Sequence, residues 1–171
     1  MEETTEVRDP MNLDELTKKE FSFTVDYSES IEHLIKRSGN VIERSDMSFA
    51  NFKIPRGKKG KRFKITAQIF PGLNHRNILA EMQEKGYFGA NIFEAAKFSI
   101  KYPHIQHQIT FFVPAEERYS DCYNNVHSIC FSVNKYKDKI ISRDIIHFDD
   151  KSKNVETIYL LGVKVEEIVE E

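Results

Sequence analysis

The sequence predicts an α+β fold in which a mixed or mostly antiparallel sheet of about six to seven strands is packed by about three helices. Three observations lead to this fold class. Several segments alternate apolar and polar residues at the strand period, others combine helix caps with the helical period, and the last four apolar segments are all strand-like. This order of elements disfavours a doubly wound parallel sheet.

A single domain of ordinary composition accounts for most of the 171 residues. Apolar residues make up 40% of the chain and charged residues 30%, which excludes collagen-like, low-complexity and wholly disordered chains. The 13 phenylalanines and 7 tyrosines can fill a core without disulfides or metals. We expect a mobile acidic arm over residues 1–18, the α+β domain over residues 19–166 and an acidic end over residues 167–171.

The first half of the chain predicts one helix and three strands. Residues 21–27 form the first strand, because four aromatic or apolar residues alternate with polar ones. A helix follows, with Ser28 as its N-cap and Gly39 just beyond its end. Residues 48–54 and 62–70 form a strand pair, and the glycines between them make the link a turn. The pair is therefore a predicted hairpin.

The second half predicts two helices and then four strands. One helix runs from its cap Asn74 to Lys85, and the next begins at Asn91, where Glu94 completes a capping box. The second helix ends before Tyr102-Pro103. Its apolar residues cover more than one narrow stripe, so it is expected to be the most buried helix. The strands are expected in residues 105–113, 126–133, 139–148 and 156–165.

The charge, the apolar runs and the cysteine content of the sequence indicate where in the cell the protein is located. The net charge of −2 and the pI near 6.3 give no global attraction to nucleic acid or to an anionic membrane. The sequence has no apolar run of membrane-spanning length, and its first residues are acidic and lack an apolar leader. We therefore expect a cytoplasmic protein without a membrane partner, whose two cysteines, Cys122 and Cys130, are reduced.

The segment KIPRGKKGKRFK, residues 53–64, is the most unusual local feature. It holds seven cations and no acid: Lys53, Arg56, Lys58, Lys59, Lys61, Arg62 and Lys64. The rest of the chain has 18 cations against 27 acids, a net charge of −9. At a hairpin tip, such a basic segment can bind phosphates or an acidic protein surface, and an exposed Phe52 or Phe63 can stack on a base. The alternative interpretation is a solvated turn, with both phenylalanines in the core.

The histidines and cysteines do not predict a metal site. In an extended strand, His104 and His107 point to opposite faces. Cys122, His127 and Cys130 lack the close ligand spacing of zinc sites. We assign no metal and no cofactor.

One segment has a possible catalytic interpretation. Asp149 and Lys151, after an apolar strand, are similar to the acid-x-Lys element of metal-dependent nucleases, with Asp138 or Asp144 as a second carboxylate. The alternative is a turn between two strands. The sequence contains neither a phosphate-binding glycine loop nor a nucleophile elbow. We therefore assign no catalytic residue.

One resemblance concerns the fold only. The stretch GYFGANIFEAAKFSIKYPHIQ, residues 86–106, followed by apolar strands that end in YLLGVKV, resembles a recurrent arrangement in small uncharacterised bacterial α+β proteins. Its key positions are Gly86, Tyr87, Ala90, Glu94, Tyr102, Pro103 and Gln106. The resemblance implies a compact unit of helices on a sheet, and it transfers no functional residue.

These observations favour a non-enzymatic binding module that contacts an anionic partner, either nucleic acid or an acidic protein surface, through the basic hairpin. A second hypothesis is a structural or regulatory protein that associates through an apolar patch, including with copies of itself. The third is a divalent-metal-dependent nuclease around Asp149 and Lys151.

Overall fold

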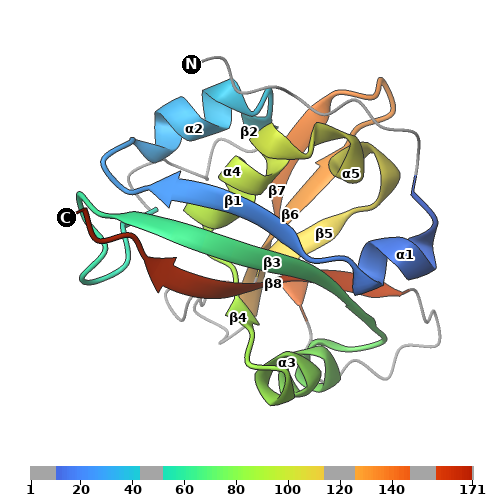
Figure 1. Cartoon of the computed structure of the whole chain (residues 1–171). Coiled ribbons are helices and arrows are strands. Elements are labelled where there is room, and N and C mark those ends of the chain that lie inside the picture. The colour runs from blue at the N-terminus through green and yellow to red at the C-terminus, as the bar shows by residue number, and fades with distance from the viewer. Residues whose placement is uncertain (1–10, 43–51, 114–125, 147–156, 171) are drawn as a thin grey trace.

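The computed structural model describes residues 11–42, 52–113, 126–146 and 157–170. These residues form an α+β fold with one eight-stranded mixed sheet and five helices (Figure 1). The predicted fold class is confirmed, while the described helices and strands are more numerous than expected. The additional elements are short, which explains why the hydrophobic periodicity of the sequence did not predict them.

Seven strands form the sheet in the order β1-β3-β8-β5-β6-β7-β2, and β4 pairs with β8 beside β5. The pairs β2·β7 and β5·β8 are parallel, and the other pairs are antiparallel. The strands are β1 (Phe21–Asp26), β2 (Val41–Ile42), β3 (Arg62–Gly72), β4 (Phe88–Gly89), β5 (Phe111–Val113), β6 (Val126–Val133), β7 (Lys139–Ile146) and β8 (Ile158–Glu167).

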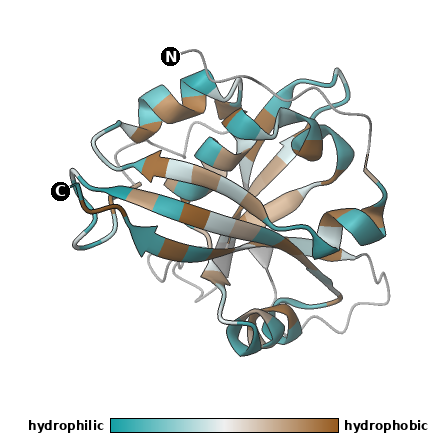
Figure 2. Ribbon diagram, in the orientation of Figure 1, coloured by the Kyte–Doolittle hydropathy of each residue, from teal (hydrophilic) through white to brown (hydrophobic). Residues whose placement is uncertain are grey.

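The alternation predicted for β1 and β3 is confirmed, and it defines two faces of the sheet. Phe21, Phe23 and Val25 are buried on one face, opposite the buried odd-numbered residues of β3. Figure 2 shows hydrophobic and hydrophilic residues alternating along both strands. The polar residues Ser22 and Thr24, opposite Thr66 and Lys64, lie on the other face. At β1, this second face is only partly covered.

The helices are α1 (Leu13–Lys18), α2 (Ile31–Arg37), α3 (His75–Glu84), α4 (Ile92–Lys101) and α5 (Pro103–Gln108). The predicted caps Asn74 and Asn91 are confirmed, and the second forms the expected capping box with Glu94. The cap of α2 is Ser30, not Ser28, whose amide and hydroxyl donate to Asp26 instead.

Helix α4 is the most buried of the described helices, as expected. Phe98 at its centre packs edge-on against Phe21 and Phe111, with ring centroids 5.2 and 5.6 Å apart. Helices α2 and α5 pack beside it, so these three helices cover the main core. On the opposite face, α3 covers a smaller apolar cluster that includes Phe70, Met82 and Leu160. Gly162 allows this close packing.

Two segments differ from the prediction. Residues 105–108, expected to begin a strand, belong to α5, because Pro103 is well suited to the first turn of a helix. Leu13–Lys18 form α1, within the segment expected to be a mobile arm. Leu16 is fully buried, and the Thr17 carbonyl accepts a hydrogen bond from Gln68. The packed fold therefore includes α1; residues 1–10 lie outside the described residues.

Candidate functional site

The basic segment, residues 53–64, is not the expected hairpin. Residues 56–60 form turns, and β3 pairs with β1 and β8 rather than with the residues just before it. Tyr27, just past the end of β1, donates its amide to the Lys61 carbonyl and accepts from the Gly60 amide. These bonds draw the segment onto β1. Residues 48–51 of the expected partner strand lie outside the described residues.

Lys58, at the centre of the basic segment, turns toward the body of the protein. Its Nζ lies 3.2 Å from Oε1 of Glu94 in α4. The same nitrogen lies 5.3 Å from the ring centroids of both Tyr27 and Phe63, a distance at which aromatic faces attract cations. Lys58 therefore ties the segment to the fold and is not directed at a partner.

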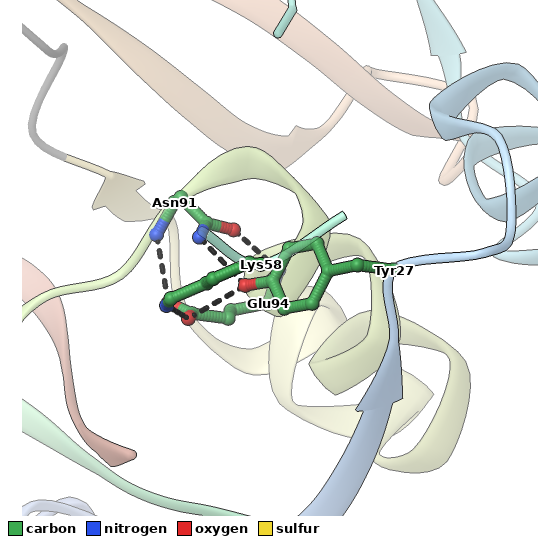
Figure 3. A network of polar contacts seen from close by, with 4 residues as sticks. All are labelled: Tyr27, Lys58, Asn91 and Glu94. Atoms are coloured by element: carbon green, nitrogen blue, oxygen red, sulfur yellow. Dashed lines mark hydrogen bonds and ion pairs between the residues drawn. The ribbon is translucent and has the colours of Figure 1, made fainter. Parts of the chain in front are cut away.

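Glu94 is the centre of this polar network, which Figure 3 shows from close by. The Tyr27 hydroxyl donates to Oε1 of Glu94 over 2.9 Å, and the backbone amide of Asn91 donates to Oε2 over 3.0 Å. Asn91 Nδ2 in turn donates to the Tyr27 hydroxyl. Only 1% of Glu94 is exposed, so these donors and Lys58 compensate for the burial of its charge. The network is structural.

Two more cations of the basic segment have acidic neighbours. Lys61 lies 2.9 Å from Glu167, and Arg62 lies 3.3 Å from Glu170. Both pairs are exposed and contribute little to stability, but they lower the local positive potential. Among the described residues, no ion pair is formed by the other four cations of the segment: Lys53, Arg56, Lys59 and Lys64.

Lys64 is the member of the segment that lies in a concave site. A groove of about 420 Å³ runs along β1, within the size range of ligand sites in proteins. We call it the lysine groove. Its lining residues are Ser22, Phe23, Thr24, Lys64, Lys97, Lys101 and Ile168.

Helix α4 places two of the three lysines in the groove. Lys97 and Lys101 lie one turn apart on one side of the helix, where like charges repel. Lys101 donates one hydrogen bond to the Ser22 carbonyl over 2.6 Å, and its ammonium group retains two further donors. Lys97 is only 8% exposed.

Two acids border the lysine groove. Glu166 lies opposite Lys64 in the β3·β8 register. Asp26 has a pKa below its usual value, chiefly because Ser28 donates two hydrogen bonds to it and also because Arg62 and Lys97 are nearby cations. Asp26 is therefore ionised at neutral pH and offsets part of the positive charge.

Sequence reasoning missed Lys97, Lys101, Ser22 and Thr24. A signal existed for the two lysines, because they stand four residues apart in the most apolar helix. Their proximity to Lys64 depends on the packing of α4 on β1, which no local pattern specifies. Of the predicted site residues, only Lys64 lines this groove; Lys58, Lys61 and Arg62 contact acids elsewhere.

The other candidate residues are dispersed or lie outside the described residues. His104 and His107 lie in helix α5, which corrects the expectation that an extended strand directs them to opposite faces. Cys130 is buried in β6, whereas Cys122 lies outside the described residues, as do Asp149 and Lys151. Asp138 accepts a hydrogen bond from Asn134 in the turn before β7. Within the described ranges, no group of three or more His, Cys, Asp or Glu side chains could hold a metal ion.

A second polar cluster lies under α5. Gln106 Nε2 donates to Asn40 Oδ1 and to the carbonyl of Ser132, and its Oε1 accepts from Ser99. Lys139 donates to the carbonyls of Ser38 and Ser99, near the ends of α2 and α4. Burial lowers the pKa of Lys139 to about 8. Because its ammonium group holds two helix ends, this cluster has a structural role.

Comparisons of the chain with protein-family models, with curated protein sequences and with solved structures gave no match. Of the helices that the structure describes, none is long and apolar enough to cross a lipid bilayer.

Proposed function

We propose that this protein is a non-enzymatic binding module for an anionic partner and that the lysine groove is its contact surface. The observation that supports this function is the convergence of Lys64, Lys97 and Lys101 from two elements onto one groove. Ser22 and Thr24 add hydroxyl donors to the same lining. Carboxylates and phosphates are the groups that such a set of donors binds best.

The remaining exposed cations of the basic segment have a secondary role in this proposal. Lys53, Arg56 and Lys59 supply long-range attraction, while Lys64 and Lys101 make the contacts. The basic segment therefore contributes to partner binding mainly through Lys64. This assignment differs from the sequence-based hypothesis, in which all seven cations form the site.

The proposal is tested by titrating the full chain into two dye-labelled polyanions, an oligo-glutamate peptide and an oligothymidylate, at low and physiological salt. Binding to at least one probe should weaken steeply as salt rises, because charged contacts displace counterions. Replacing Lys64 and Lys101 together by Gln should weaken binding about tenfold or more. Fluorescence anisotropy measures both effects.

The matched control replaces Lys53 and Lys59 together by Gln. This variant has the same net charge as the Lys64→Gln, Lys101→Gln variant but leaves the groove intact, so it should lose no more than about threefold in affinity. Equal losses in the two variants would mean that only net charge matters. The groove would then not be the contact surface.

A further inference from the structure

The edge of the sheet borders the lysine groove. β1 is the terminal strand of the described sheet and pairs only with β3. The bonds that Tyr27 makes to Gly60 and Lys61 show that odd-numbered residues of this strand direct their backbone groups toward the β3 side. The even-numbered residues Ser22, Thr24 and Asp26 therefore direct their N–H and C=O groups outward.

Protein groups occupy both ends of this edge. The Ser22 amide donates to the Tyr102 hydroxyl, and the Ser22 carbonyl accepts from Lys101 and Tyr102. At the other end, the Asp26 carbonyl accepts from the Glu29 amide. Between these points, the N–H and C=O of Thr24 face the lysine groove, which Thr24 itself lines.

We propose that the anionic ligand is an extended acidic peptide segment of a partner protein, which adds to the edge of β1 at Thr24. This inference rests on the proposed function and specifies its ligand. An extended peptide supplies both a donor for the Thr24 carbonyl and an acceptor for the Thr24 amide. A phosphodiester group has no hydrogen-bond donor and can use only the amide.

The positions of the lysines fit such a ligand. Lys64 lies on the polar face of the sheet, whereas α4 carries Lys97 and Lys101 on the face that it covers. Successive side chains of an added strand point to opposite faces. Neighbouring acidic residues of the peptide would therefore meet Lys64 on one face and Lys101 on the other.

The surroundings of the groove disfavour the two other occupants. A nucleic acid strand binds through base stacking, but the aromatic ring in the lining, Phe23, is only 3% exposed. A second copy of this chain, paired edge to edge, would bring two sets of groove lysines together.

The test uses the full chain, with the oligo-glutamate peptide and the same peptide N-methylated at alternate residues. N-methylation removes the backbone donors that pairing with an edge needs, so affinity should fall about tenfold. Thr24→Pro removes the outward amide at an edge position where proline is tolerated, and should cause a similar loss. Thr24→Val keeps the amide and removes only the hydroxyl, so it should lose less affinity than Thr24→Pro. Amide NMR spectra confirm that each variant is folded.

Other outcomes distinguish failure of edge pairing from failure of the proposed function. If Lys64→Gln with Lys101→Gln weakens binding but N-methylation and Thr24→Pro do not, edge pairing is refuted and the proposed function stands. Binding of oligothymidylate without oligo-glutamate refutes the peptide ligand and leaves an anion-binding groove. A concentration-dependent dimer that Thr24→Pro abolishes assigns the edge to a second copy and also refutes the inference. If neither probe binds, both proposals fail.

Discussion

Glu94 changes the role of the basic segment, because it holds Lys58 against the body of the protein. The lysine stands among six other cations that the sequence groups together, yet its Nζ lies against Glu94 and two aromatic rings. Glu94 also completes the capping box of α4. A single carboxylate therefore joins the start of that helix, the end of β1 and the basic segment.

Glu94→Ala should lower the free energy of unfolding by about 2–4 kcal/mol. The change removes the capping contact and leaves the Tyr27 hydroxyl and Lys58 without their acceptor in a poorly solvated region. Urea unfolding measures the loss. The control is Glu81→Ala, which breaks the exposed pair with Lys85 and should cost less than about 1 kcal/mol. Equal losses would contradict the structural role of Glu94.

His75 should make the fold sensitive to acid. Burial lowers its pKa from 6.5 to about 4, so between these pH values the unfolded chain binds a proton that the folded protein does not. The contribution of neutral His75 to the free energy of unfolding is therefore complete above pH 6.5 and is lost as the pH falls toward 4. Urea unfolding at several pH values should show a shallower acid dependence for His75→Gln. Parallel curves for His75→Gln and the unaltered protein would refute the assignment.

At the scale of elements, the sequence predicted what local chemistry determines. The caps Asn74 and Asn91 and the alternation in β1 and β3 are local signals, and the structure confirms them. The sequence pattern did not predict α5, because residues 105–108 also fit a strand. Pro103 favours the first turn of the helix, and the hydrogen bonds of Gln106 to β6 and β7 hold the helix against the sheet. Short elements such as β2 and β4 depend entirely on their neighbours.

Gly162→Ala tests the packing of α3 against the sheet. A Cβ atom at this position would lie 2.7 Å from Phe70 Cε2 and 3.0 Å from Met82 Cε. Both are ring or side-chain atoms of the smaller apolar cluster, which must shift to make room. The variant should lose about 1–3 kcal/mol in urea unfolding. Val165→Ala, at a partly exposed position of the same strand, should lose less; the opposite ranking would be inconsistent with this packing.

Across the whole molecule, some charged side chains form ion pairs, whereas three lysines line the lysine groove. The chain as a whole is nearly neutral, and the cations at Lys61 and Arg62 meet acids from the C-terminal end. Only tertiary packing brings Lys64 to Lys97 and Lys101. The sequence could therefore reveal that positive charge is unevenly distributed, but it could not reveal where an excess remains in a concave surface.

The most direct test of the lysine groove as the contact surface is lysine acetylation of the full chain with and without oligo-glutamate, read by mass spectrometry. This role of the groove predicts that the peptide slows acetylation of Lys64 and Lys101, while Lys53 and Lys59 react at nearly unchanged rates. Protection of Lys53 and Lys59 with no change at the two groove lysines would contradict it and would return the contact to the basic segment.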